Sequence, residues 1–229
     1  MKKQQLLEHL LESKLFKRFY YFFNKNIIRV RNFDSKARLK NCLFNDNKND
    51  TNKVVLDKAH LKNCKFIFSG GGNSLIIEKG AQIQDLECFF LDNNSSIVIG
   101  KNTQIGSNCK LVVGEETSIS IGEKCLISYD VEIRSTDSHS LFNEDGIRIN
   151  KAKNVLIGNH VWISSGVIIL KGTIIDDECM IGTKSIITQK TPHQPKAMIV
   201  GAPGTIRREN IQWNEKRVMK EWKWLIPRI

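Results

Sequence analysis

Six isoleucines stand at intervals of six residues in the second half of the chain: Ile157, Ile163, Ile169, Ile175, Ile181 and Ile187. Neither an α-helix, with 3.6 residues per turn, nor an alternating strand has this period. A small or β-branched residue stands four places after each of the first five: Val161, Val167, Thr173, Cys179 and Ser185. A period of six, with one inward aliphatic side chain on each flat face, predicts an all-β parallel β-helix.

Upstream of the isoleucine series, the chain repeats with a longer period of 22 residues. Apolar residues recur with it in three sets: Val55, Ile77, Ile99 and Ile121; Leu61, Ile83, Ile105 and Ile127; Ile67, Phe89, Leu111 and Ile133. A stretch rich in Gly, Asn, Asp and Ser closes each repeat, as expected where a backbone turns a corner in contact with water. Residues 54–134 are therefore predicted to form four wide coils, and residues 157–190 to form tighter ones.

An insertion separates the two series. The longer period places the next apolar residue at position 143, but Ile157 has that role instead. The extra residues, about 136–155, leave the solenoid at the corner that carries Asp137, Ser138 and His139. One irregular loop on a regular scaffold, beside a histidine, indicates a functional site.

Both ends of the chain differ from the solenoid in charge. Residues 1–40 hold 11 Lys and Arg against 3 acids, and residues 206–229 hold 7 against 3, within a total formal charge of +11. We expect an N-terminal helical capping segment over residues 1–53, a β-helix domain over 54–205 and a C-terminal helix over 206–229. The N-terminal helix either covers the open end of the solenoid or lies on an anionic membrane surface.

Other classes of protein fit less well. No basic run belongs to a recognisable nucleic-acid module, and no signal peptide or spanning segment is evident, which predicts a cytoplasmic protein, at most peripheral to the inner face of the membrane. The six cysteines contain no CxxC pair and are expected as small core residues in a reducing compartment. His60, His139 and His160 include no close pair, so no metal is expected and a β-helical zinc enzyme is disfavoured.

Three motifs, which follow one another along the chain, are similar to those of a known family. They are Asp137-Ser138-His139, then residues 157–163 (IGNHVWI), then Gly201-Ala202-Pro203 before Arg207-Arg208. This set, within residues 54–208, resembles the hexapeptide-repeat acetyltransferases, and most closely the branch that O-acetylates bacterial capsule and O-antigen sugars. The resemblance implies a left-handed β-helix, a homotrimer, and acetyl-CoA bound between neighbouring subunits. The left hand comes from the resemblance alone, because the spacing does not determine it.

The resemblance makes His139 the catalytic histidine, and a histidine suits a general base near neutral pH. Asp137, two residues earlier, would share a face with it in extended backbone, and would orient the imidazole, bind the acceptor sugar or cap its own turn. Glu132 and Asp130 are alternative orienting carboxylates. The resemblance implies that Trp162 stacks on the sugar or flanks the thioester; the alternative is that it packs in the interior.

For acetyl-CoA, the resemblance implies contacts from Ser165 and Thr183 along the pantetheine arm, from Thr188 near the later turn, and from Arg208 near the phosphates. Arginine suits phosphate because its planar fork bonds two oxygens. The chain departs from the family at Gln189 and Thr205, where basic residues are frequent. Lys190 and Arg207 are therefore additional candidates for the nucleotide end.

The predicted function is an acetyl-CoA-dependent O-acetyltransferase that acts on a hydroxyl of a surface polysaccharide or its sugar precursor. Two alternatives remain open on the same fold: an amino-sugar N-acetyltransferase, and a β-helix without catalytic activity that serves as a structural or binding module. The carbohydrate acceptor itself is not identified by the sequence.

Overall fold

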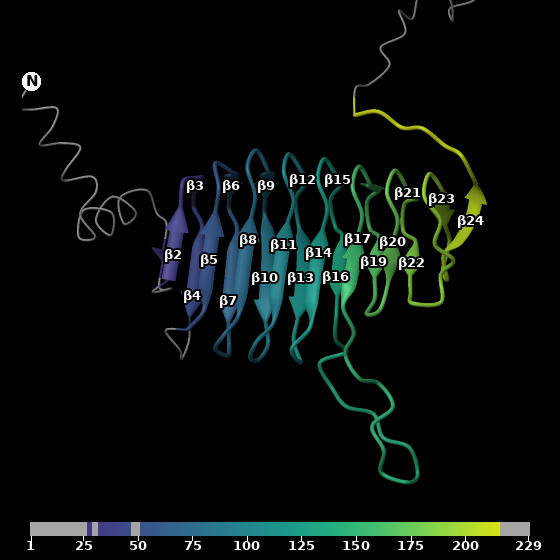
Figure 1. Ribbon diagram of the computed structural model, residues 1–229, viewed down its shortest axis with the longest axis horizontal. Coiled ribbons are helices and arrows are strands. Elements are labelled where there is room, and N and C mark those ends of the chain that lie inside the picture. The colour runs from purple at the N-terminus through teal and green to yellow at the C-terminus, as the bar shows by residue number, and fades with distance from the viewer. Residues whose placement is uncertain (1–26, 29–31, 47–50, 216–229) are drawn as a thin grey trace, which may run out of the picture.

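The computed structural model describes residues 27–28, 32–46 and 51–215, and these form a three-sided parallel β-solenoid (Figure 1). Successive strands fall in turn on three sheets, so the chain visits sheet B, sheet C and sheet A in each coil before it returns to sheet B. The fold is therefore a prism with three faces, and the corner between sheets A and B lies opposite sheet C.

The strands of each sheet run in parallel and in sequence order. Sheet A contains β1 (Ile27–Ile28), β4 (Leu43–Asp46), β7 (Lys65–Phe68), β10 (Leu86–Phe90), β13 (Cys109–Val113), β16 (Glu132–Arg134), β19 (Ile168–Ile169) and β22 (Ile186–Ile187). Sheet B contains β2 (Asn32–Ser35), β5 (Lys53–Leu56), β8 (Ser74–Ile77), β11 (Ser96–Ile99), β14 (Ser118–Ile121), β17 (Val155–Ile157) and β20 (Ile174–Ile175). Sheet C contains β3 (Arg38–Lys40), β6 (His60–Lys62), β9 (Gln82–Gln84), β12 (Gln104–Ile105), β15 (Leu126–Ile127), β18 (Trp162–Ile163), β21 (Met180–Ile181), β23 (Met198–Val200) and the antiparallel β24 (Thr205–Arg208).

The solenoid interior is apolar, and all six periodic isoleucines lie in it with at most 1% of their surface exposed. The predicted register is shifted by one residue in two places. Leu56, not Val55, pairs with Ile77 in sheet B, and Cys88, not Phe89, pairs with Leu111 in sheet A. The coils there hold one residue fewer or one more than the strict period, so Ile67 and Phe89 face outward and are only partly buried.

Contacts between successive coils locate the extra chain between β16 and β17. Before the loop, Lys101 contacts Glu123 of the next coil across 22 residues of sequence, whereas Glu123 contacts Asn159 of the coil after it across 36 residues. The strand pairing shows the same two spacings, because Ile99 pairs with Ile121 and Ile121 pairs with Ile157. The excess chain leaves after β16 and returns before β17. Figure 1 shows the resulting loop projecting from the edge at which sheets A and B meet.

The predicted boundary at residue 54 is too late. Strands β2, β3 and β4 already pair with β5, β6 and β7, because apolar residues such as Phe33 and Phe44 extend the solenoid core toward the N-terminus. The described residues contain no helix. Residues 205–208 form a strand instead of the start of the predicted C-terminal helix. Helices were predicted within residues 1–53 and 206–229, and of these segments residues 1–26 and 216–229 lie outside the described residues.

No helix in the described part of the chain has the length and apolarity required to cross a bilayer. All six cysteines are buried thiols that form no disulfide with a described residue, and burial is what the sequence predicts for small core residues. Burial raises the pKa of the Cys109 and Cys125 thiols to about 11, so both stay protonated near neutral pH.

Candidate active site

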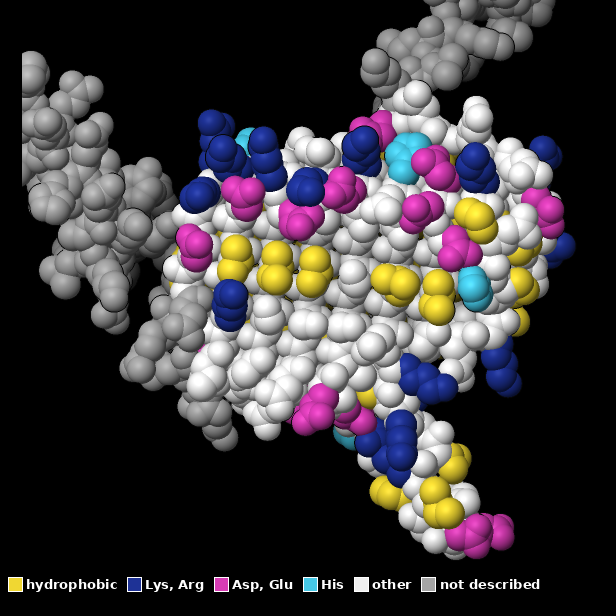
Figure 2. All heavy atoms as spheres, viewed as in Figure 1, with side chains coloured by type: hydrophobic (Ala, Val, Ile, Leu, Met, Phe, Trp, Pro, Cys, Tyr) yellow, Lys and Arg dark blue, Asp and Glu magenta, His cyan; other side chains and the backbone are white. Residues whose placement is uncertain are grey.

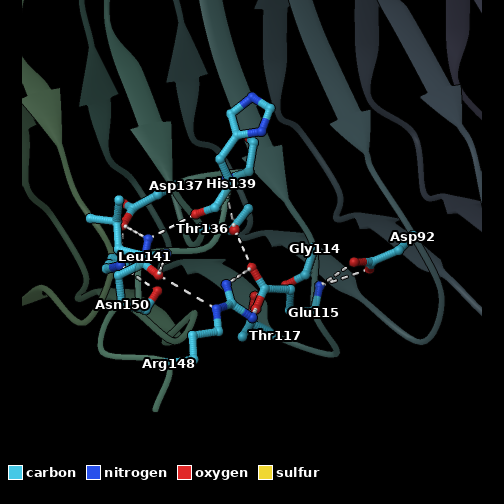
Figure 3. A network of polar contacts seen from close by, with 12 residues as sticks. Asp92, Gly114, Glu115, Thr117, Thr136, Asp137, His139, Leu141, Arg148 and Asn150 are labelled. Atoms are coloured by element: carbon cyan, nitrogen blue, oxygen red, sulfur yellow. Dashed lines mark hydrogen bonds and ion pairs between the residues drawn. The ribbon is translucent and has the colours of Figure 1, made fainter. Parts of the chain in front are cut away.

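Asn150 ties together the base of the inserted loop (Figure 3). Its amide nitrogen donates to the Asp137 carboxylate and to the backbone carbonyl of His139, at 2.8 Å in each case. Its amide oxygen accepts a hydrogen bond of 2.7 Å from the Leu141 N–H. A single side chain on the returning segment of the loop thus fixes the outgoing segment that carries both predicted catalytic residues.

Asp137 is held by the coil that follows the loop. Its carboxylate accepts hydrogen bonds from Lys171 Nζ and from Asn150, and the Lys171 side chain is only 16% exposed. Partial burial acts to raise the pKa of Asp137, but these hydrogen bonds outweigh it, and the pKa lies below its ordinary value. Asp137 is therefore an ionised anchor of the loop in this structure.

Asp137 and His139 do not share a face, contrary to the expectation from extended backbone. Ser138 between them has a φ of 66°, which places it in the left-handed region and turns the chain. The turn is fixed by a hydrogen bond of 3.0 Å from the Ser138 N–H to Thr136 Oγ1. Figure 3 shows the His139 ring pointing away from the polar cluster around Asp137 and Asn150.

The His139 imidazole is exposed, and it makes no hydrogen bond to any residue that the structure describes. The alternative carboxylates are engaged elsewhere. Glu132 pairs with Arg134 at 3.2 Å, and Asp130 accepts a hydrogen bond of 2.6 Å from Asn108. His139 therefore presents both ring nitrogens to solvent from a backbone position that the loop holds in place.

A second ion pair clamps the loop to the preceding coil. Arg148 binds the Glu115 carboxylate at 2.5 and 2.9 Å, and Thr136 Oγ1 donates to the same carboxylate at 2.6 Å. The Glu115 N–H in turn donates to Asp92. The Arg148 hydrogen bonds, with that from Thr136, lower the pKa of Glu115 from its ordinary 4.5 to about 2.

Trp162 lies on the outer face of sheet C and is partly buried there, which excludes the packing role in the solenoid interior. Its ring centroid is 6.0 Å from that of Trp213, which stacks on His160 at 4.1 Å and donates to the His160 carbonyl at 2.9 Å. Because sheet C lies opposite the corner between sheets A and B, one chain does not bring Trp162 to His139.

The predicted coenzyme residues fall in three places on a single chain. Ser165 and Thr183 lie one coil apart at the corner between sheets C and A, joined by a hydrogen bond of 2.9 Å from the Lys184 N–H to the Ser165 carbonyl. Thr188 and Lys190 lie beyond β22, where Thr188 Oγ1 accepts from the Lys190 N–H at 3.2 Å. The third place is β24, on which both predicted arginines are exposed: Arg207 and Arg208.

The loop anchors were not predicted from the sequence. Asn150 and Lys171 contact Asp137 across 13 and 34 residues, and Arg148 contacts Glu115 across 33. The only sequence signal was a concentration of polar and basic residues within and just after the insertion. Among the described residues, no group of three or more His, Cys, Asp and Glu side chains is placed to hold a metal ion.

Known proteins with similar sequences are acetyltransferases, although no protein-family profile matches the chain. A polysialic acid O-acetyltransferase of Neisseria meningitidis is 50% identical over 52 residues, which are 22% of this chain and 24% of that relative. Another, from Escherichia coli O1:K1 / APEC, is 33% identical over 93 residues, 40% of this chain and 30% of the relative. The chain thus matches less than a third of the length of either relative.

Solved structures are similar over most of the chain. A crystal structure of a polysialic acid O-acetyltransferase superimposes with a TM-score of 0.74 at 27% identity, covering 87% of this chain and 92% of that one. A polySia-specific acetyltransferase gives a TM-score of 0.72 at 27% identity, with 86% and 87% covered. The local identity and the superposition over most of the chain show that it is similar, in sequence and in fold, to hexapeptide-repeat acetyltransferases of the capsule polysaccharide O-acetyltransferase branch.

Proposed function

We propose that the protein transfers an acetyl group from acetyl-CoA to a hydroxyl of a bacterial surface polysaccharide or of its sugar precursor. The observation that carries the proposal is an exposed histidine with an unengaged imidazole, held by a polar clamp on the insertion of an acetyltransferase fold. The acceptor class is supported by the relatives, which act on polysialic acid.

In this proposal His139 is the general base. The sugar hydroxyl would attack the thioester carbonyl of acetyl-CoA while His139 accepts the hydroxyl proton. The C–S bond would then break, and the departing CoA thiolate would take that proton from His139, which leaves the sugar ester, free CoA and a neutral imidazole. A neutral imidazole has a free lone pair for this proton, and no described residue competes for it. General base catalysis of this kind contributes about 10²–10⁴-fold to the rate. Asp137 acts as a positioning residue, because its contacts with Lys171 and Asn150 fix the turn on which His139 is presented.

The active site is proposed to lie between subunits of a homotrimer, with His139 of one subunit facing Trp162 of its neighbour. This arrangement is supported by the separation of the two residues within one chain. It is also supported by apolar residues exposed on the loop: Leu141, Phe142, Ile147 and Ile149, each 58–64% exposed. A row of apolar side chains crosses the outer face of sheet B as well (Figure 2). Buried apolar surface is what stabilises permanent oligomers.

Acetyl-CoA is proposed to bind along the corner of Ser165 and Thr183. The residues fit the pantetheine arm, because neither the Ser165 nor the Thr183 amide N–H donates to another described residue. These two donors, one coil apart, can meet amide carbonyls of an extended arm. Lys190, Arg207 and Arg208 are exposed cations that are proposed to bind the phosphates. The Thr188 hydroxyl accepts a hydrogen bond from the Lys190 N–H, so Thr188 is proposed to fix the turn that carries Lys190.

The test is acetyl-CoA turnover with the host surface polysaccharide, followed by mapping of the acetylated position by NMR. An amino-sugar acceptor is assayed in parallel to distinguish transfer to nitrogen. The expected effect of His139→Ala is a loss of about 10²–10⁴-fold in turnover with an unchanged melting temperature, because its ring packs against nothing in the solenoid core. Near-normal turnover by this variant would remove His139 from the mechanism.

A further inference from the structure

The last described residues turn back along the solenoid. Residues 209–215 follow β24 and form a strap, and Figure 1 shows this segment doubling back over earlier coils. The Ile211 N–H donates to the Lys196 carbonyl, just before β23, at 2.9 Å. Further along the strap, the Gln104 side chain on β12 donates to the Glu215 carboxylate at 3.4 Å. The strap therefore runs along sheet C from β23 back to β12.

Alternate residues of the strap face the solenoid. Ile211 and Trp213 are partly buried, whereas Gln212 and Asn214 are exposed. This alternation is that of an extended segment with one side against a surface. Trp213 is the larger of the two inward side chains, and its ring lies on the outer side of sheet C beside Trp162. Its contacts therefore act on that outer face and not on the packing of the solenoid interior.

His160 fixes the Trp213 ring at the corner between sheets B and C. The two rings stack with centroids 4.1 Å apart and an angle of 10° between them. The Trp213 indole N–H also donates to the His160 carbonyl at 2.9 Å. The imidazole is itself held by the following coil, because its Nδ1 lies 2.7 Å from the Glu178 carboxylate. Since the indole is held both by its face and by its N–H, Trp213 is a rigid contact.

Trp162 is the side chain that this rigid contact reaches. On sheet C the strand register places Leu126 on one side of Trp162 and Met180 on the other. Both are flexible aliphatic side chains, and methionine in particular adapts to its surroundings. The Trp213 ring lies at a centroid distance of 6.0 Å and an angle of 44°, within the range of about 4.5–7 Å at which aromatic pairs attract. Trp213 thus supplies a flat, fixed neighbour against which the Trp162 ring packs.

A fixed neighbour matters because the strand that carries Trp162 is short. Strand β18 holds only Trp162 and Ile163, and Ile163 points into the interior. An indole on an outer face rotates about its side-chain bonds, and every orientation other than the productive one lowers the fraction of molecules that are ready to react. The contact from the strap restricts this rotation at a predicted acceptor residue.

We propose that Trp213 is a positioning residue, which holds the Trp162 ring in the orientation that receives the acceptor. The inference rests on the proposed function, in which Trp162 faces His139 of a neighbouring subunit. It adds that the strap forms part of the wall of the active site. It also gives a role to His160, which fastens the strap beside Trp162.

The test compares three variants of the full-length protein. Trp213→Leu removes the flat ring, Trp213→Phe keeps a ring but lacks the N–H, and Gln212→Ala changes the adjacent exposed residue of the strap as a matched control. Acetyl transfer is measured to polysialic acid and to the host surface polysaccharide, and kcat and both KM values are determined with the acceptor that the wild type uses. A partly unfolded variant loses active enzyme, which lowers kcat and leaves both KM values unchanged.

We expect Trp213→Leu to raise the KM for the acceptor roughly tenfold, the factor that corresponds to the loss of a strong aromatic pair. The KM for acetyl-CoA should stay unchanged. Trp213→Phe should recover most of the loss, and Gln212→Ala should behave like the wild type. An unchanged KM for the acceptor in Trp213→Leu would overturn the inference, and so would an equal rise in Gln212→Ala.

Near-UV circular dichroism tests the contact without catalysis, because two indoles in contact give a coupled signal that is lost with either partner. Trp213→Leu and Trp162→Leu should change the spectrum alike, and the double variant should add little to either change. Tryptophans common to all the variants cancel in the difference spectra. Changes that simply add would overturn the inference. A wild type that gives the coupled signal but transfers acetyl to neither polysaccharide would instead overturn the proposed function and leave the contact between the two rings established.

Discussion

The wide coils before the inserted loop and the narrow coils after it share three sheets but differ in how they are filled. Sheet A strands are five residues long in β10 and β13 but two residues long in β19 and β22. The wide coils enclose stacked rings such as Phe68 and Phe90, 4.4 Å apart. The narrow coils enclose isoleucine and valine. The wide coils offer a long outer surface, and the narrow coils carry the predicted coenzyme and acceptor residues.

The inserted loop leaves where wide coils give way to narrow ones, and each half holds one side of it. Glu115 of the wide half binds Arg148, and Lys171 of the narrow half binds Asp137. The position of His139 therefore depends on both halves. Three changes test this division of roles, in order of decreasing effect.

The largest effect is expected from Ile169→Asp in the narrow coils. Ile169 is fully buried, and an unpaired carboxylate in an apolar interior costs several kcal/mol, a large part of a typical net stability of about 5–15 kcal/mol. Limited proteolysis should cleave the narrow coils. The matched control is Ile168→Asp on the same strand, whose side chain points outward and is partly buried. Equal resistance of both variants to proteolysis would contradict the inward register of β19.

A smaller effect is expected from Asn150→Ala. Loss of its four side-chain hydrogen bonds frees the turn that carries His139, and misplacement of a catalytic group by about 1 Å costs on the order of 100-fold in rate. Turnover should fall while the thermal unfolding of the solenoid changes little. Asn143→Ala, at the tip of the same loop, removes comparable local bonds to Asp145 and Ile147. If Asn143→Ala lowered turnover as much as Asn150→Ala, the clamp would not be what positions His139.

The smallest effect is expected from acid. The pKa of Glu115 is about 2 in the folded protein against an ordinary 4.5, so its ion pair stabilises the folded loop above pH 4.5. This contribution is lost as the pH falls from 4.5 toward 2, where the carboxyl becomes protonated. Protection of the loop amides from hydrogen exchange, measured against the intrinsic exchange rate at each pH, should fall across that interval. In Glu115→Gln the exchange should be faster at neutral pH and should lack this step.

The fold followed from the sequence because each coil repeats the same local requirement. One inward isoleucine every six residues, and one polar corner in each wide coil, define the three faces without knowledge of any distant contact. The predicted strand register was wrong by one residue at Leu56 and Cys88, where the length of the coil differs from the period. Periodicity does not report such a shift, because apolar residues stand on both sides of it.

The site was predicted only in part, because its anchors are not periodic. The break in the period before Ile157 located the loop and drew attention to His139. The φ of 66° at Ser138 and the reach of Lys171 across 34 residues arise from how an irregular loop folds back on the solenoid. A sequence carries no period from which such contacts could be read.

The most direct test of a site shared between subunits is a complementation assay. His139→Ala and Trp162→Ala subunits are each purified alone and also co-expressed, and acetyl transfer to the polysaccharide is measured. We predict that each variant alone is inactive and that mixtures regain up to about a quarter of wild-type turnover, because a mixed ring of three restores one site. Mixed assemblies that stay as inactive as the separate variants would contradict an active site built from His139 of one subunit and Trp162 of the next.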